Sequence, residues 1–377
     1  MDNVTVVPMD IHKKFSKAVA LDCHGDAVDE WRVDHIDKDC MREFFALFDR
    51  GTPVVMEATF NWQWIADIAE QSGMDVHLVD AFAARKMARN MSKTDRKDAI
   101  WLGKLFLAPA VFPEAYLAPK AVRKMRCLFR QRGLLVKLRV AIKGAVHGQL
   151  FRLGVVVTDE DATDLFGRKG REFLKDLELD ADERSLLDQK LEVVDHLTEQ
   201  IQVLEAEIVR QLGSDPAARI VMSIPGIGVI VAYAVLAEIG EIGRFPNGRA
   251  LAGYAGVLPL DDESAGKESP EHVNRRCNRY LKWALLEGVT GAIRGSARLR
   301  GLYQRVRARN NDRPGKARVA VARELAELVH YLLRRGKMYQ ENAPARPGSV
   351  ESKIATDPDR ARQTTLSARS SMSQAAP

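Results

Sequence analysis

The chain has 377 residues, of which 46% are hydrophobic, so it is long enough for two domains with substantial cores. A formal net charge of +6 favours a polyanionic partner. Because no apolar run reaches about 18 residues and no signal-peptide pattern opens the chain, a membrane protein is excluded and a cytosolic one is expected. The four cysteines show no Cys-x-x-Cys spacing and are expected to be reduced thiols, which excludes a disulfide frame or a zinc site.

The first hundred residues predict a mixed α/β sheet. Residues 3–33 are typical of a small antiparallel meander, because short β-rich runs alternate with turn residues. Helical and strand patterns then alternate, with helices over 35–50, 61–73, 81–90 and 95–106 and strands over 52–58 and 75–80. This order of elements fits the ribonuclease H-like fold.

A basic helix is predicted next, over residues 120–152. The segment holds ten Lys/Arg and no acids, and its apolar residues recur at near-helical spacing. We interpret it as a long helix whose basic outer face contacts nucleic acid. The alternative is a solvated helix that packs on its own domain. The candidate nucleic-acid contacts are Arg123, Lys124, Arg126, Arg130, Lys137, Arg139 and Lys143.

An acidic segment follows. Residues 158–207 hold 16 acids against six bases, and apolar residues recur at heptad spacing over 187–212. This pattern predicts a coiled coil, with a helical hairpin within the chain as the alternative. The heptad residues are Leu187, Val194, Leu197, Ile201, Leu204 and Ile208.

The last third of the chain is predicted to be helical and basic. The motif Ser-Ile-Pro-Gly-Ile-Gly opens an apolar stretch over 220–258, and its Gly226 and Gly228 offer backbone N–H groups to a DNA phosphate. Tight packing of the turn between helices is the alternative. Residues 271–337 hold 17 bases against five acids. The residues expected to share a DNA-binding helix face are Arg275, Arg276, Arg279 and Lys282.

Four carboxylates stand out as candidate metal ligands. Asp10 and Glu57 end strand-like runs, while Asp95 and Asp98 lie one helical turn apart and so share a face. Four unpaired carboxylates in one pocket would repel one another, and divalent cations remove that repulsion. Hard oxygen ligands suit Mg²⁺, with Mn²⁺ as a second choice, and two such ions can clamp a phosphodiester. The bases expected to hold the nucleic-acid backbone at this site are Lys93, Arg96 and Lys97.

Each acid, considered alone, also fits an ordinary structural role that involves no metal. Asp10 is also typical of a turn, and Glu57 of a helix cap. An Asp-x-x-Asp pair on a surface helix is usually solvated, and Asp95 also suits a helix N-terminus.

At these residues the chain resembles the DEDD-type insertion-sequence transposases, the group that also includes a pilin-gene DNA invertase. The segments MDIHKK, VVMEATFNWQW and SKTDRKDAIWLGKL are similar to the three acidic motifs of that family. A second block is similar to its C-terminal domain and consists of IPGIGVIVAYAVLAEIGEIGRFPNGRALAGYAGVLP, ESAGK and VNRRCNRYLKWALLEG. The similarity spans about residues 4–340 in the family's order.

The resemblance implies a ribonuclease H-like domain whose Mg²⁺ ligands are Asp10, Glu57, Asp95 and Asp98. It also implies a helical C-terminal domain in which Ser264 attacks DNA and forms a phosphoserine link. Lys267 lies beside this serine in the sequence and is a further candidate nucleic-acid contact. In the family, the composite site forms between protomers of a tetramer, and some members are guided by an RNA from their own element.

We therefore expect a bacterial, nucleoid-associated recombinase that cuts and rejoins duplex donor and target DNA. Its expected partners are a guide RNA encoded by the element and further copies of the chain, which form a dimer to tetramer. The domains expected are 1–155 (catalytic), 156–213 (acidic connector), 214–341 (helical with the serine) and 342–377 (a disordered tail).

The sequence departs from the family pattern in two places, and three other functions compete with the expected one. Proline at position 8 is disfavoured in a central strand, so an irregular strand is expected just before Asp10. Ser269 competes with Ser264 as the nucleophile, because alanine rather than glycine follows Ser264. The rivals are a DNA invertase of the same family, a metal-only junction resolvase or nuclease, and a nucleic-acid-binding protein without activity.

Overall fold

A computed structural model describes residues 4–59, 61–87, 94–158, 163–258 and 276–341, together with the backbone of 263–264 and 267–268. The chain divides into two compact units, Met1–Lys120 and Ala121–Pro377. The tail predicted over 342–377 lies outside the described residues. No described helix is long and apolar enough to cross a membrane, and all four cysteines are free.

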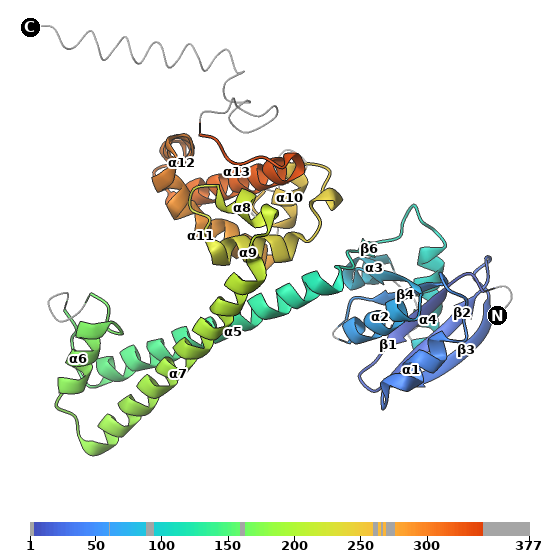
Figure 1. Cartoon of the computed structure of the whole chain (residues 1–377), viewed down its shortest axis with the longest axis horizontal. Helices are drawn as coiled ribbons and strands as arrows, with labels where there is room; N and C mark the ends of the chain where they lie inside the picture. Colours follow the sequence, from blue (N-terminus) through green and yellow to red (C-terminus); the bar gives the residue numbers. More distant parts are fainter. Residues whose placement is uncertain are drawn as a thin grey trace, which may run out of the picture. The chain divides into compact units, whose positions relative to one another are not determined.

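The first unit is built on a six-stranded sheet in the order β3-β2-β1-β4-β5-β6 (Figure 1). The first three strands form the predicted antiparallel meander, whereas β4 and β5 run parallel to β1 and β6 closes the edge antiparallel. The mixed α/β character predicted from the sequence is therefore confirmed. The strands are β1 (Val7–Ile11), β2 (Phe15–Leu21), β3 (Ala27–Asp34), β4 (Pro53–Glu57), β5 (Asp75–Val79) and β6 (Glu114–Ala115).

Helices cover both faces of this sheet, and each face has its own core. The alternation of side chains along a strand sends Met9 and Met56 to one face and Val6 and Val55 to the other. The first face packs on α1 and α2, and the second on α3 and α4. The helices of this unit are α1 (Lys38–Phe45), α2 (Trp62–Gln71), α3 (Ala81–Met87) and α4 (Asp95–Phe106).

Pro8 lies inside β1 and does not break it. The strand pairs with β4 through Pro8 and Val55, so the proline occupies an ordinary register position on that side. On the other side the ladder with β2 ends at Met9 and resumes only as an isolated bridge at Val6. Because proline has no N–H to donate, we attribute the gap in this ladder to Pro8.

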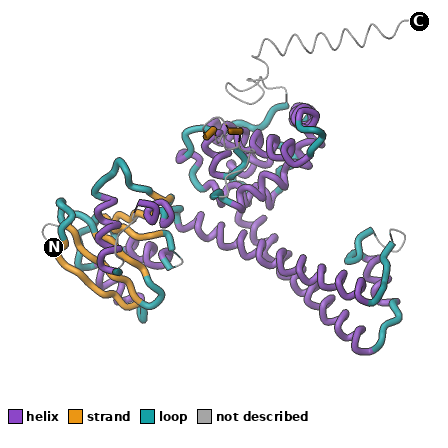
Figure 2. Tube along the Cα trace, turned by 180° about the vertical axis from the view of Figure 1, so that it is seen from behind, coloured by secondary structure: helices purple, strands orange, loops and turns teal. Residues whose placement is uncertain are grey.

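The second unit begins with a long helical hairpin (Figure 2). Helices α5 (Lys120–Arg152) and α7 (Ala181–Leu212) lie side by side and antiparallel, because Arg132 bonds Glu205 near one end and Arg152 bonds Glu183 near the other. The short helix α6 (Arg168–Asp176) packs with both at the far end. The heptad positions of α7 are partly buried within this chain, with Leu187, Val194, Ile201 and Ile208 shielded from solvent.

The hairpin explains the acid-free composition of α5. Its arginines find their carboxylates on other helices: Arg132 on Glu205 at 2.8 Å, and Arg152 on Glu183 at 2.7 Å. The basic and the acidic segments therefore neutralise each other across the hairpin. A basic outer face of α5 reserved for nucleic acid is accordingly smaller than the sequence suggested.

The remaining helices form an all-α core, as predicted. Phe129 of α5 and Ile208 of α7 enter this core, which joins it to the hairpin. The basic helices are interrupted between α12 and α13, where Asn311 and Asp312 adopt positive φ and Pro314 starts the last of the described helices. The helices are α8 (Pro216–Met222), α9 (Val229–Ile239), η1 (Ile242–Arg244), α10 (Gly248–Tyr254), α11 (Arg279–Gly295), α12 (Ala297–Arg309) and α13 (Pro314–Arg335).

Gly226 sits in the turn between α8 and α9 and touches the backbone of α11. Its φ is +86°, and a Cβ there would lie 2.3 Å from the Gly288 carbonyl oxygen and the Ala292 nitrogen. Close packing, the alternative reading of the Ser-Ile-Pro-Gly-Ile-Gly motif, therefore accounts for this glycine. Gly228 differs, because a Cβ there would meet nothing within 4 Å.

Candidate metal centre

Asp10 and Glu57 lie at the carboxyl ends of two adjacent parallel strands. Met9 pairs with Met56, so the residues that follow them, Asp10 and Glu57, are neighbours at the end of the ladder. Because Met9 and Met56 face α1 and α2, the alternation along each strand sends Asp10 and Glu57 to the α4 face. The register thus brings these two predicted ligands to one edge and one face of the sheet.

The first turn of α4 supplies the other two acids. Thr94 caps the helix by accepting a hydrogen bond from the Lys97 amide at 3.3 Å, and Asp95 and Asp98 both lie in the turn that follows. Carboxylates are favourable there because helix N-termini carry partial positive charge. A glycine lets the helix approach the sheet: a Cβ on Gly103 would lie 2.4 Å from a Leu21 methyl and 2.8 Å from the Pro8 ring.

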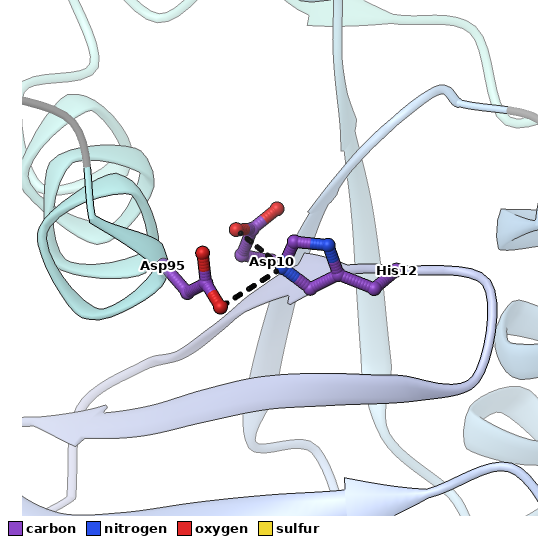
Figure 3. A group of neighbouring side chains, drawn as sticks. All are labelled: Asp10, His12 and Asp95. Atoms are coloured by element: carbon purple, nitrogen blue, oxygen red, sulfur yellow. Dashed lines mark ion pairs between the residues drawn. The ribbon is translucent and has the colours of Figure 1, made fainter.

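A histidine that the sequence analysis did not assign lies between two of these acids (Figure 3). His12 Nε2 is 3.2 Å from Asp10 Oδ2 and 3.3 Å from Asp95 Oδ2. The Nε2 atom is shielded from solvent and lies at ion-pair distance from both carboxylates. The spacing of His12 from Asp10 could have indicated this position in the sequence, since residues i and i+2 of a strand share a face.

The electrostatics of Asp10 agree with this convergence. Burial of its carboxyl, which is 24% exposed, raises its pKa above the usual value. The negative charges of Asp95 and Asp98 raise this pKa further, while His12 opposes both effects. A metal-free site thus pays a penalty for ionising Asp10, as expected where a cation would otherwise neutralise the acids.

These residues fit a divalent metal ion. Within the part of the chain that the structure describes, one ligand atom each of Asp10, His12 and Asp95 lie within 4.8 Å of one another. Carboxylate oxygens are the ligands that Mg²⁺ and Mn²⁺ take in proteins, and the imidazole nitrogen offers a further donor. Asp98 acts electrostatically on Asp10, and Glu57 lies beside it in register.

A stability measurement can test the raised pKa of Asp10. The folded state holds the Asp10 proton more tightly than the unfolded state, so its contribution to stability falls as pH rises through the window between the two pKa values. Above that window the penalty is fully present. We expect Asp10→Asn to raise the unfolding free energy of the metal-free protein at pH 7 by on the order of 1 kcal/mol.

The measurement is urea denaturation with a chelator, at pH 7 and again near pH 3. The gain should shrink at the lower pH, where the wild-type carboxyl is protonated in both states. Asp26→Asn, at an exposed turn, is the control and should change little. A destabilised Asp10→Asn protein at pH 7 would contradict the electrostatic account.

Basic side chains and a hollow adjoin the acids. Arg96 donates to Glu30 at 2.9 Å, and Lys17 lies 3.3 Å from the same carboxylate, so both bases are held in place at the side of Asp95. Lys97 is exposed on the first turn of α4, and Lys93 lies outside the described residues. The hollow has a volume of about 510 Å³ and is lined by Phe15, Lys17, Arg32, Thr94, Asp95 and Arg96.

Ser264 lies on a short two-stranded element rather than in a plain loop. Strands β7 (Glu263–Ser264) and β8 (Lys267–Glu268) pair antiparallel, with Ser264 opposite Lys267. The side chains of both residues, and the whole of Ser269, are outside the described part of the chain. Ser264 as the nucleophile stays a prediction.

A buried ion-pair network holds the two ends of the serine-bearing segment. The Asn278 backbone N–H donates to the Tyr254 carbonyl at 2.8 Å. The side-chain amide of Asn278 donates to Tyr254 Oη and to the Glu238 carboxylate. Glu238 is fully buried and accepts two hydrogen bonds from Arg130, at 3.0 and 3.1 Å. Arg126 donates to the backbone carbonyls of residues 237 and 238. We call these five residues the Glu238 network.

The network changes the interpretation of several predicted DNA contacts. Within the Glu238 network, Arg126 donates to a backbone carbonyl and Arg130 donates to the Glu238 carboxylate. Arg123 is only 5% exposed. Burial also lowers the pKa of Arg126, an effect that Glu238 opposes. The sequence did not reveal this because the partner acid lies more than a hundred residues further along the chain.

The other bases predicted to contact DNA fall into two groups. Arg139 donates to Thr198 at 3.2 Å and Lys143 lies over the Phe166 ring at 4.4 Å, whereas Lys124 and Lys137 are exposed. The shared helix face expected for the C-terminal bases is wrong, because Asn278 caps α11 and the helix begins only at Arg279. Of the other three bases predicted on this face, Arg276 precedes α11 and is exposed, and Lys282 lies on α11. Arg275 is outside the described residues.

Comparison with known families gives two matches in the order of the chain. Residues 7–153 match a family model of IS110 transposases of the DEDD type, and residues 218–304 match the model described as "Transposase IS116/IS110/IS902 family". The first match contains the acid cluster and the second most of the helical core. Together they define a transposase, an enzyme that cleaves DNA and transfers its strands.

Individual relatives agree with this class. A "Probable family 20 transposase" of Pseudomonas aeruginosa is 25% identical over 359 residues, which cover 90% of this chain and 99% of that protein. An uncharacterized 43.6 kDa protein of insertion element IS110 from Streptomyces coelicolor is 33% identical over 147 residues, 39% of this chain and about a third (36%) of the relative's length. The transposase of insertion element IS1328 from Yersinia enterocolitica is 23% identical over 76% of this chain and 83% of its own. The chain belongs to the IS110/IS116/IS902 family of transposases.

Proposed function

We propose that this transposase cuts and rejoins duplex DNA at a site where Asp10, Glu57, Asp95 and Asp98 hold two Mg²⁺ ions. The observation that carries the proposal is the convergence of these acids on the α4 face of the sheet. There the charges of Asp95 and Asp98 raise the pKa of Asp10. When bound, such ions neutralise charge on a scissile phosphate and activate an attacking oxygen. The protein's own part is to hold the four carboxylates ionised at one point.

The fold supports this assignment to nucleic-acid chemistry. We propose a ribonuclease H-like catalytic domain over 1–155, because an antiparallel meander followed by two strands parallel to the first agrees with the order expected from the sequence. We further propose that 156–213 act as a connector, that 214–341 form the serine-bearing domain and that α7 pairs with a second copy as a coiled coil. The last point draws on the exposed Leu186, Val193 and Val203 of that helix.

Ser264 is the nucleophile that we propose for strand cleavage. Its Oγ would form a bond to the scissile phosphorus while the bond from phosphorus to one DNA oxygen breaks. The serine proton leaves from Oγ, and the departing DNA oxygen takes up a proton to become a hydroxyl. Rejoining is the reverse reaction, in which a DNA hydroxyl attacks the phosphoserine and frees the serine, so the energy of the phosphodiester is kept.

Bases around both parts of the chain would hold the DNA backbone. We propose that Lys93, Arg96 and Lys97 position the strand at the acids, with the hollow beside Asp95 taking an adjacent phosphate. In the second unit, the proposed contacts are Lys124, Lys137, Lys267, Arg275, Arg276 and Arg279, together with the Gly228 N–H.

The proposed partners are duplex donor and target DNA, a guide RNA encoded by the element, and further copies of this chain, from a dimer to a tetramer. These follow from the resemblance and from the basic charge of the chain. Within this proposal, a DNA invertase acting at one fixed site is the alternative, and a metal-only resolvase is the rival mechanism.

Covalent trapping tests the proposal. Full-length protein would be incubated with donor DNA, target DNA, the RNA of its flanking element and Mg²⁺, and then denatured. We expect DNA linked to protein in the wild type and in Ser269→Ala, and no linked DNA in Ser264→Ala or Asp98→Ala. Circular dichroism of each variant checks that it is folded.

The other outcomes separate the rivals. If DNA is cleaved without forming an adduct, and the cleavage persists in Ser264→Ala, the protein is a metal-only nuclease. An adduct lost only in Ser269→Ala would move the nucleophile to that serine. Activity unchanged in Asp10→Ala would contradict the metal site itself.

A further inference from the structure

We infer that His12 is a nitrogen ligand of the metal centre and biases it towards Mn²⁺ over Mg²⁺. The inference rests on the proposed metal-dependent function and adds a donor that the four carboxylates do not provide. It concerns the imidazole in the turn after β1, whose Nε2 faces Asp10 and Asp95 (Figure 3).

The turn that carries His12 is fixed in place. The His12 N–H donates to the Phe15 carbonyl at 2.9 Å, which closes the connection between β1 and β2. The Asn61 side chain, just after the strand that ends in Glu57, donates to the carbonyls of His12 and Lys13 at 3.1 and 3.3 Å. The first and second acidic motifs are thereby tied together, so the backbone position of His12 is set by the same elements that set the acids.

The ring itself is also oriented. His12 stacks on Phe15 with ring centroids 4.6 Å apart and an interplanar angle of 27°. The guanidinium of Arg32 lies 3.6 Å from the centroid of the same Phe15 ring. A side chain that is 36% exposed and held in this way has lost rotamer freedom before any ligand arrives, as a preorganised metal ligand requires.

The distances suit shared coordination. Two ligand atoms about 2.1 Å from one octahedral ion lie about 3.0 Å apart. The Nε2 atom is 3.2 Å from Asp10 Oδ2 and 3.3 Å from Asp95 Oδ2, so each of these two separations is within a few tenths of an ångström of that value.

Pairing with one carboxylate alone does not account for the position of this ring. An imidazole retained to neutralise a single acid would lie against that acid, because charge-assisted hydrogen bonds are the strong ones. The Nε2 atom is instead shielded from solvent and lies almost equally far from Asp10 Oδ2 and Asp95 Oδ2. A nitrogen in this position can share an ion with both carboxylates.

The nitrogen donor has a consequence for metal choice. Mg²⁺ prefers oxygen and gains little from imidazole, whereas Mn²⁺ and later divalent metals gain affinity from it. Removal of the ring should therefore weaken Mn²⁺ binding much more than Mg²⁺ binding.

Electron spin-echo spectroscopy of bound Mn²⁺ tests the inference directly. Full-length protein loaded with Mn²⁺ alone should show modulation from a coordinated ¹⁴N nucleus, and the wild type labelled with ¹⁵N-histidine should show the ¹⁵N pattern instead. The modulation should vanish in His12→Ala and persist in the matched control His24→Ala, an exposed histidine of the next turn. Titration should show at least a tenfold loss of Mn²⁺ affinity in His12→Ala.

The outcomes separate the two proposals. Saturable Mn²⁺ binding without nitrogen modulation in the wild type, or modulation that survives His12→Ala, would overturn the role of His12 and leave the carboxylate site intact. Absence of saturable Mn²⁺ and Mg²⁺ binding would overturn the metal site and His12 with it. The labelled wild type gives a result even if His12→Ala does not fold.

Discussion

Gly226→Ala is expected to unfold the helical part of the second unit. The new Cβ would lie 2.3 Å from two backbone atoms of α11, and a backbone neighbour cannot rotate away. The φ of +86° adds a left-handed conformation that costs an L-residue about 1–2 kcal/mol. The combined loss should exceed about 4 kcal/mol, a large share of the stability of a typical domain.

Gly228→Ala is the matched control for that variant. It lies two residues away in the same motif, has a φ of −86°, and leaves open space around a new Cβ. We expect a change within about 1 kcal/mol, which reflects only the exchange at the helix N-cap. Hydrogen exchange of α9 and α11 peptides would measure both variants, and equal protection in the two would refute the packing role of Gly226.

Glu238→Ala is expected to cost on the order of 3 kcal/mol, because it removes the acceptor that Arg130 and the Asn278 side chain share, together with a negative charge beside Arg126. The carboxylate has no exposed surface and accepts bonds from Arg130 and Asn278, while Arg126 lies 3.7 Å away. Glu238→Gln keeps the shape but removes the charge, so an intermediate loss is expected.

An exposed ion pair provides the comparison for Glu238. Glu207 pairs with Arg210 on the surface of α7, and its pKa is lowered to about 2 chiefly by the hydrogen bond from Arg210. Glu207→Ala should nevertheless leave stability little changed, since solvent screens such pairs. Urea unfolding followed at Trp283, which packs against Phe129 in this unit, would report both variants. Equal midpoints would contradict the structural role of the buried carboxylate.

Much of the architecture follows from short-range patterns in the sequence. Alternation along 3–33 and the helical periods that follow predict the sheet and its helices, because side-chain burial repeats every two or 3.6 residues. The acids at the ends of β1 and β4 are recognisable for the same reason: a strand's register fixes which edge its last residue reaches. The two-residue strands, such as β6 (Glu114–Ala115), are too short to leave a periodic signal.

Interactions between distant residues were harder to predict. The acid-free run of α5 suggested a nucleic-acid surface, but its partners Glu183, Glu205 and Glu238 lie on other helices. Composition within one helix cannot reveal which charges another helix brings to it. His12 escaped notice for a different reason, because its role depends on a turn held by Asn61 and Phe15 rather than on its own residue type.

The hydrogen bond from the Asn278 backbone N–H to the Tyr254 carbonyl joins the end of α10 to the start of α11. The entropy cost of closing a loop grows only slowly with its length, by about 0.6 kcal/mol for each doubling. An insertion between these two residues, away from Ser264, should therefore cost little stability and leave the packing of the helical core unchanged.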